Sequence, residues 1–217
     1  MRRFTIAGLM TAGLAAAAAY GLSPMPVLHA QTAATSDTAK AIFAGGCFWC
    51  VESDFDQAPG VISTTSGYTG GHLDNPTYRQ VVTETTGHRE AVLVEYDPQK
   101  VSYEHLLDVF WHSVDPTDAH GQFCDRGESY TTAIYTMGDD QQKMAEASSV
   151  EIAKDLGEPV ATLIAPAQTF YPAEDYHQDY YLKNPVRYKY YRFGCRRDAR
   201  LDRLWGEDAH RGLSKTH

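Results

Sequence analysis

The chain has 217 residues, with 28 acidic and 19 basic side chains and a formal net charge of −9 at pH 7. An acidic chain is a poor ligand for nucleic acid, so we expect no nucleic-acid partner. The length suffices for one compact domain with a sizeable core, and no internal repeat is visible.

The first thirty residues have the layout of a secretory signal peptide. Arg2 and Arg3 precede an apolar run over residues 6–22, and small residues lead to a candidate cleavage site at Ala30. The run is short and rich in Ala and Gly, which favours a cleaved signal over a permanent membrane anchor. We therefore predict a signal peptide over residues 1–30 and a periplasmic or secreted protein, which meets the membrane only if the signal is retained.

The remaining chain alternates predicted strands and helices between a flexible leader (31–40) and a charged, frayed tail (207–217), which leaves one domain over 41–206. Apolar residues at period two predict strands, and apolar residues three or four apart predict helices. In chain order these are strand 41–44, helix 47–57, strand 61–68, strand 91–96, helix 103–113, strand 131–136, helix 139–156 with Asp139 as its N-cap, and strand 160–164.

This order of elements predicts an α+β protein built as a two-layer sandwich, with helices packed against one sheet. We expect a ferredoxin-like core, in which a strand is inserted into a split βαβ unit. The aromatic, proline-punctuated segment 170–191 predicts an irregular C-terminal wrap over that core.

The most informative motif is Gly45-Gly46-Cys47-Phe48-Trp49-Cys50. A predicted strand precedes the glycines and a helix follows them, which places Cys47 at a helix N-terminus. Unpaired N–H groups and the positive end of the helix dipole favour a thiolate there. Cys50 lies one helical turn later, within reach of the Cys47 sulfur. The spacing predicts a thiol that attacks a substrate and is then resolved as a disulfide.

Other side chains are candidates to act with the first cysteine. Glu90 begins a predicted strand, where burial would raise its pKa enough for a general acid; a solvated strand-end carboxylate is the simpler interpretation of this segment alone. Tyr78 and Tyr130 lie in turn-rich segments and could donate hydrogen bonds to a substrate, or simply pack. Phe48 and Trp49 could line an apolar pocket or belong to the core.

Six motifs, in the same order, resemble the peptide methionine sulfoxide reductase A family. They are Gly45–Trp49, Gly67–Gly71, Asn75–Tyr78, Thr86–Glu90, Asp125–Gly127 with Tyr130, and Glu174–Tyr180 with Lys183–Pro185. The match covers roughly residues 40–190. One such motif would recur by chance, whereas six in order are specific.

The resemblance implies an enzyme that reduces the S epimer of methionine sulfoxide, free or in proteins, and so repairs oxidised proteins. Cys47 would attack the sulfoxide sulfur and become a sulfenic acid, and Glu90 would protonate the oxygen. The tyrosines would hold that oxygen, and two aromatic residues would enclose the S-methyl group. The substrate-binding residues implied are Phe48, Trp49, Tyr78, Tyr130 and Asp125.

The resemblance also implies that no cofactor is needed and that a thioredoxin-like partner reduces the resulting disulfide. The sequence departs from the commonest pattern at Cys50, where most members have Gly and resolve with C-terminal cysteines. We expect Cys50 to resolve, with Cys195 as the alternative. Cys124 and Cys195 would then form a structural disulfide, or Cys195 would relay electrons outward.

A second departure flanks Tyr130. The family usually has Gln before this tyrosine and Arg-Ser after it, whereas Ser129 precedes it here and Thr131 and Thr132 follow. The position of the tyrosine is kept, but peripheral substrate contacts cannot be carried over from the family.

Three other functions compete with this interpretation. A thioredoxin-like disulfide oxidoreductase would also use Cys-x-x-Cys, but that class usually has small residues between its cysteines. A zinc site built from all four cysteines lacks paired spacing at Cys124 and Cys195. A non-enzymatic peptide-binding module would use the aromatic segment 170–191.

Overall fold

The computed structural model describes residues 38–214, so the predicted signal peptide and most of the predicted leader lie outside the described residues. The strands are β1 (Ala39–Gly45), β2 (Val61–Thr69), β3 (Arg89–Tyr96), β4 (Gly121–Gln122), β5 (Asp125–Arg126), β6 (Thr132–Thr136), β7 (Leu163–Pro166) and β8 (Tyr171–Pro172). The helices are α1 (Phe48–Phe55), α2 (Tyr78–Val81), α3 (Tyr103–Trp111), α4 (Asp139–Leu156), α5 (Tyr180–Lys183), α6 (Pro185–Gly194) and α7 (Arg197–Trp205), with short 3₁₀ helices η1 (Glu128–Tyr130) and η2 (Gly206–Asp208).

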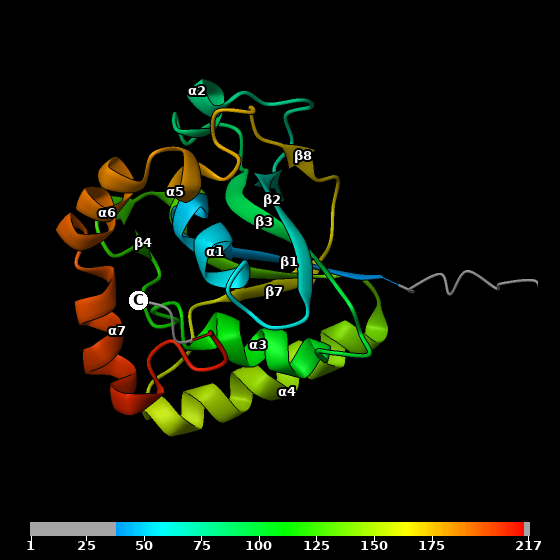
Figure 1. Cartoon of the computed structure of the whole chain (residues 1–217). Helices are drawn as coiled ribbons and strands as arrows, with labels where there is room; N and C mark the ends of the chain where they lie inside the picture. Colours follow the sequence, from blue (N-terminus) through cyan, green and yellow to red (C-terminus); the bar gives the residue numbers. More distant parts are fainter. Residues whose placement is uncertain (1–37, 215–217) are drawn as a thin grey trace, which may run out of the picture. The chain divides into compact units, whose positions relative to one another are not determined.

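One six-stranded sheet, in the order β7-β6-β1-β3-β2-β8, organises the described chain (Figure 1). Both β1 and β2 run antiparallel to β3, which lies between them. The unit β1-α1-β2 is therefore a parallel crossover split by an inserted strand. This arrangement, with β6 antiparallel to β1 on its other side, is the predicted ferredoxin-like core, and the predicted α+β sandwich is confirmed.

The main core lies between this sheet and the helices α1, α3 and α4. Phe43 of β1 stacks against Phe55 of α1 and Phe110 of α3, with ring centroids 4.8 and 5.2 Å apart. Burial of such a side chain contributes about 2–3 kcal/mol. On β3, Val92 and Val94 face this core. Side chains of a strand alternate between faces, so Glu90 must point toward the helices as well.

The opposite face of the sheet carries a smaller apolar cluster. Its buried members are Ile42, Ala44, Ala91, Ala133 and Tyr135. Ala167 and Phe170, from the segment before β8, pack against it. This face is the one toward which Arg89 points, because its guanidinium donates to the Tyr135 hydroxyl over 3.2 Å.

Several predicted boundaries need correction. The strand β1 begins at Ala39, so the last two residues of the predicted leader belong to the sheet. Helix α4 starts where predicted, but Gly138 occupies its N-cap position, not Asp139. Strand β7 begins at Leu163, later than the predicted strand at 160, because its register is set by parallel pairing with β6.

The C-terminal third is more regular than predicted. The segment expected to be an irregular wrap contains β8, α5 and most of α6, and the following helix α7 was missed. Nor is the tail frayed up to residue 214: the His210 N–H donates to the His112 carbonyl, and the Ser214 N–H to the Gln57 carbonyl, both over 3.0 Å. Tertiary contacts, which a local pattern does not reveal, order this charged segment.

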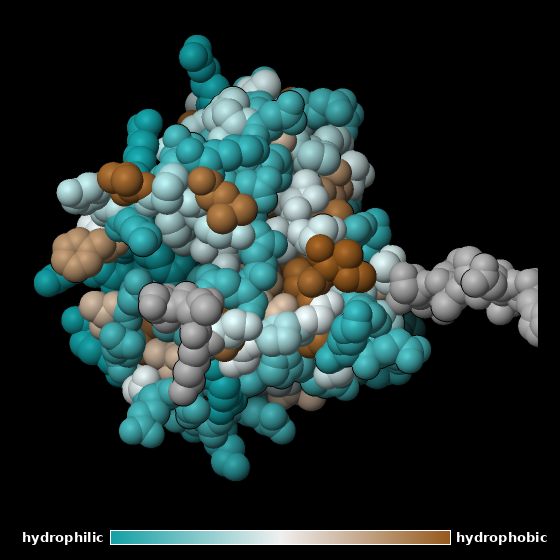
Figure 2. Space-filling view, in the orientation of Figure 1, coloured by the Kyte–Doolittle hydropathy of each residue, from teal (hydrophilic) through white to brown (hydrophobic). Residues whose placement is uncertain are grey.

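The surface carries no large apolar patch on the face seen in Figure 2, where brown residues form small, separate groups among hydrophilic ones. Within residues 38–214, no helix is both long and apolar enough to span a bilayer.

Arg197, at the start of α7, ties the C-terminal helices to the end of β1. Its side chain is fully buried, and its guanidinium donates to the Gly45 carbonyl over 3.2 Å and to the Ser113 carbonyl over 2.8 Å. Arg197 therefore links α7 to Gly45 and Ser113, which lie 152 and 84 residues away from it in sequence.

We predict that Arg197→Ala lowers the free energy of unfolding by about 3 kcal/mol, because it leaves two buried carbonyls without a donor. Urea denaturation monitored by circular dichroism measures this loss. Arg187→Ala, on the exposed side of α6, is the control and should change it by less than about 0.5 kcal/mol. Equal losses in both variants would contradict a specific role for Arg197.

Candidate active site

The turn between β1 and α1 places Cys47 as the N-cap residue of α1. Gly46 adopts a φ of +82°, and a Cβ on it would lie 2.5 Å from the Cβ of Gln122. Gln122 is itself buried, and its amide bonds the backbone N–H and carbonyl of Asp115. Only glycine fits such a close, left-handed turn, so the sequence Gly-Gly before the cysteine fixes where Cys47 lies.

The structure brings the two free thiols together in a buried position. Cys47 is 6% exposed and Cys50 is 2% exposed. The Cys50 N–H donates to the Cys47 carbonyl over 3.0 Å, which forms the first turn of the helix. The two thiol groups are hydrogen-bonded to each other. The proximity expected from the Cys-x-x-Cys spacing is therefore present.

The predicted thiolate at Cys47 is wrong, because the surroundings of this thiol favour its protonated form. Burial raises the pKa of Cys47 well above its usual value, and the neighbouring Cys50 and Glu90 add to the shift. In contrast, the hydrogen bond from Cys47 lowers the pKa of Cys50 to about 7, with help from the positive charges of Arg197 and Arg192. Near neutral pH the negative charge of the pair lies mainly on Cys50.

Glu90 is a buried carboxyl group beside Cys47, which excludes the alternative of a solvated carboxylate. It is 2% exposed, and its Oε2 accepts the Phe48 N–H over 2.9 Å. Burial raises the pKa of Glu90 to about 8, and the charge of Asp125 adds to this, while hydrogen bonds from Phe48 and Tyr130 oppose it. The carboxyl group therefore carries its proton at pH 7 and can donate it.

Two tyrosine hydroxyls meet beside this carboxyl group. Tyr78 begins α2 and Tyr130 ends η1, and their hydroxyls are hydrogen-bonded to each other. Tyr130 also bonds Glu90. Burial raises the pKa of Tyr78 to about 12 and that of Tyr130 further. Both phenols are therefore neutral donors throughout the physiological pH range.

The aromatic residues after Cys47 differ in their surroundings. Phe48 is buried within the main core, whereas Trp49 is only partly buried. His177 joins them: the Trp49 Nε1–H donates to its Nδ1 over 3.0 Å, and its ring centroid lies 4.9 Å from that of Phe48. Trp49 also stacks on Tyr180 at 3.7 Å between centroids. The motif Glu174–Tyr180 contains His177, but the sequence alone does not indicate that His177 lies in the site.

Tyr191 is a site residue that sequence reasoning missed. Its hydroxyl donates to the Asp125 carboxylate and also lies against Cys47. Burial raises the pKa of Asp125, which the Tyr191 hydrogen bond opposes. Helix α6 carries Tyr191, and the helical spacing within 185–194 is the sequence feature that indicates it.

Cys195 is bonded to Cys124, which joins the end of α6 to the residue before β5. Cys195 is therefore not a free thiol beside Cys47. The bond also leaves no thiolate at these two positions for the four-cysteine zinc site considered above. Asp125 follows Cys124 directly, so the disulfide links the two segments that carry Asp125 and Tyr191.

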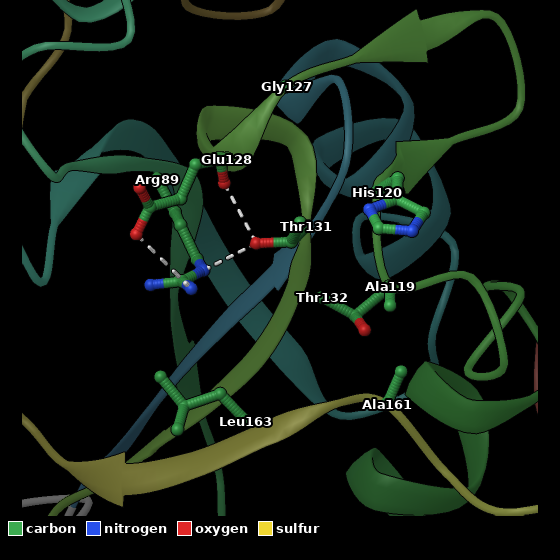
Figure 3. Close-up of a pocket in the computed structure, with 9 residues that line it drawn as sticks. All are labelled: Arg89, Ala119, His120, Gly127, Glu128, Thr131, Thr132, Ala161 and Leu163. Carbon is green, nitrogen blue, oxygen red and sulfur yellow. Dashed lines mark hydrogen bonds and ion pairs between the residues drawn. The ribbon is translucent and has the colours of Figure 1, made fainter.

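A separate cavity of about 310 Å³ opens beside η1 (Figure 3). Arg89, Glu128 and Thr131 line it, but none of the predicted site residues does. No cysteine lines it, and Arg89 faces the opposite side of the sheet from Glu90. The reaction site is therefore assigned to the thiol pair and not to this cavity.

A buried thiol pair, a neutral carboxylic acid and two phenol donors within one site can remove an oxygen atom from a substrate and store the oxidation as a disulfide. Fold and site together define a thiol-based oxidoreductase that acts on an oxygen-bearing group.

Known proteins identify the class more closely. The family described as peptide methionine sulfoxide reductase matches residues 39–209. The chain is 52% identical over 174 residues to peptide methionine sulfoxide reductase MsrA 2 of Rhizobium meliloti, which covers 80% of this chain and 87% of the relative. It is 54% identical over 178 residues to MsrA 2 of Caulobacter vibrioides, which covers 82% and 90%.

Two solved structures share the fold. Methionine sulfoxide reductase A of Corynebacterium diphtheriae superposes with a TM-score of 0.63 at 36% identity, covering 69% of this chain and 76% of that one. Reduced Mxr1 from Saccharomyces cerevisiae gives a TM-score of 0.65 at 29% identity, covering 69% and 87%. The chain belongs to the peptide methionine sulfoxide reductase A family. It catalyses the thiol-dependent reduction of methionine sulfoxide, which excludes a general disulfide oxidoreductase and a non-enzymatic peptide-binding module.

We predict that the Glu90 carboxyl group is protonated at pH 7 and titrates with a pKa of about 8, because burial disfavours its charge. Infrared difference spectra between wild type and Glu90→Gln, recorded against pH, report the carboxylic acid band directly. Glu95→Gln is the matched control on the same strand, since a hydrogen bond from Lys40 lowers the pKa of Glu95. A Glu90 band already absent at pH 6 would contradict the prediction.

Proposed function

We propose that this enzyme reduces the S epimer of methionine sulfoxide, free or within oxidised proteins, through Cys47 as nucleophile and Glu90 as general acid. The observation that carries the proposal is the buried carboxyl group bonded to the Phe48 N–H, next to the nucleophile. A neutral acid at this place can protonate the sulfoxide oxygen while the adjacent sulfur attacks.

Substrate binding follows from the two chemically different sides of the site. The sulfoxide oxygen accepts hydrogen bonds from Tyr78, Tyr130 and the protonated Glu90. The S-methyl group packs against the aromatic side formed by Phe48 and Trp49. The opposite epimer would exchange these groups and leave the oxygen without donors, at a cost of about 1–3 kcal/mol for each lost hydrogen bond. Asp125 supports the site through Tyr191.

The first chemical step transfers the oxygen to the enzyme. Cys47 passes its thiol proton to the Cys50 thiolate and attacks the sulfoxide sulfur, while Glu90 protonates the oxygen. Two electrons pass from the Cys47 sulfur to the substrate, and methionine leaves as a thioether. Cys47 then carries the oxygen as a sulfenic acid, and the proton taken up by Cys50 restores the Glu90 carboxylic acid.

Cys50 resolves the sulfenic acid. Its thiolate attacks the Cys47 sulfur, the sulfur–oxygen bond breaks as a disulfide forms, and the oxygen leaves as water with a proton from the Glu90 carboxylic acid. Cys50 is preferred to Cys195 because it is a free thiol hydrogen-bonded to Cys47, whereas Cys195 is bonded to Cys124. The Cys124–Cys195 disulfide is then structural and holds Asp125 and Tyr191 in place.

A thioredoxin-like dithiol protein completes the cycle by reducing the Cys47–Cys50 disulfide. The predicted signal peptide directs the enzyme to the periplasm or the exterior. A structural disulfide at Cys124 and Cys195 suits such an oxidising compartment.

We predict that Cys47→Ser abolishes sulfoxide reduction, because no nucleophile is left, even with dithiothreitol as reductant. Cys50→Ser should produce one equivalent of methionine per enzyme, more slowly than wild type, and then stop when thioredoxin is the reductant. Chromatography of the methionine formed measures both. Cys195→Ser is the control and should retain multiple turnovers with thioredoxin. Continued turnover by Cys50→Ser but not by Cys195→Ser would assign resolution to Cys195.

A further inference from the structure

Tyr130 lies in a segment that has little regular structure of its own. It ends the three-residue helix η1, between the two-residue strand β5 and strand β6. So short a helix cannot by itself fix a hydroxyl group to the precision that a hydrogen bond requires. The residues on either side of Tyr130, however, are each bonded to another segment of the site.

The first link joins Ser129 to Glu84. The Glu84 Oε2 accepts the Ser129 N–H over 2.9 Å, and its Oε1 accepts the Ser129 hydroxyl over 2.6 Å. Glu84 lies in the turn after α2, the helix that begins with Tyr78. This carboxylate therefore connects the segments that carry the two oxygen-binding tyrosines.

The carboxylate is closely seated against the chain. A Cβ on Gly127, the residue before η1, would lie 2.5 Å from the Glu84 Oε1. The Glu84 carboxylate therefore fits here only because Gly127 has no side chain. Glu84 itself has a φ of +62°, a conformation that is uncommon for any residue except glycine. The hydrogen bonds of the Glu84 side chain to Ser129 therefore offset the cost of this backbone conformation.

The second link joins Thr131 to Arg89, and Figure 3 shows both ends of it. The Arg89 Nε donates to the Thr131 hydroxyl over 2.7 Å, and that hydroxyl donates to the Glu128 carbonyl over 2.8 Å. Arg89 immediately precedes Glu90 on β3. Its guanidinium also donates to the Tyr135 hydroxyl, which fixes the Arg89 side chain on the face of the sheet opposite Glu90. This link sets Tyr130 relative to the general acid.

We propose that Glu84 and Arg89 are positioning residues for the reduction, which hold the Tyr130 hydroxyl against Tyr78 and Glu90 through Ser129 and Thr131. The proposal rests on the role of Tyr130 proposed above. Ser129 and Thr131 are also the two neighbours of Tyr130 at which the sequence departs from the usual family pattern, and the two links give those departures a physical role.

The consequence should appear in the chemical step more than in binding. Charge develops on the sulfoxide oxygen as the reaction proceeds, so a displaced phenol weakens the transition state more than the bound substrate. Without its link to Glu84, Tyr130 should contribute much less, and we expect a loss of about tenfold in the single-turnover rate.

Glu84→Gly is the sharpest test, because glycine accepts the φ of this position and the fold is not strained by the change. Single-turnover rates, substrate affinity and thermal unfolding are measured for wild type, Glu84→Gly, Tyr130→Phe and the double variant. We expect Glu84→Gly to slow the chemical step about tenfold with affinity nearly unchanged. In the Tyr130→Phe background the same change should cost almost nothing, because the hydroxyl it positions is absent.

Thr85→Gly, the next residue in the same turn, is the control for added flexibility, since its hydroxyl bonds only Thr83 among the described contacts. Arg89→Met tests the second link in the same cycle with Tyr130→Phe. If the Glu84→Gly loss is equally large with and without the Tyr130 hydroxyl, or if the chemical step is unaffected, the positioning role is wrong. Wild-type enzyme without turnover would instead refute the proposed function itself.

Discussion

The hydrogen bond from the Phe48 N–H to Glu90 is the interaction on which the site depends. It joins the first turn of α1 to the start of β3, and it can form only because Gly46 allows the chain to turn tightly against Gln122. The split βαβ topology places β3 directly beside β1, so the Glu90 carboxyl group on one strand meets Cys47 just beyond the end of the other. The core behind them keeps water away from both groups.

Burial raises the pKa of all three titratable groups gathered there, and the hydrogen bond between the two thiols reverses its effect at Cys50 alone. It keeps the proton on Glu90 and on Cys47, while the hydrogen bond from Cys47 lets Cys50 carry the charge. In the mechanism proposed above, the site at rest therefore holds an acid, a nucleophile and a base for that nucleophile. In the proposed mechanism the cysteine that accepts the proton, Cys50, also forms the disulfide, which links activation and resolution.

Much of this could be predicted from the sequence, and the exceptions have physical causes. Period-two and helical spacing predicted most strands and helices of the two-layer sandwich, and the motifs singled out Cys47, Glu90 and the tyrosines, which the structure brings together in one site. The sequence could not reveal the charge on Cys50, because a helix N-terminus indicates a thiolate while the depth of burial appears only in the fold. Tyr191 and the ordered C-terminal helices were missed since their order comes from distant partners, such as Asp125 for Tyr191.

The most direct test of the account is the pH dependence of the single-turnover rate in wild type and Glu90→Gln. The rate should fall below about 7, where Cys50 gains the proton it must accept, and above about 8, where Glu90 loses the proton it must donate. Glu90→Gln should be slower by about a hundredfold and lack the alkaline decline. A variant that keeps the wild-type rate, or the alkaline decline, would contradict the assignment of Glu90 as the general acid.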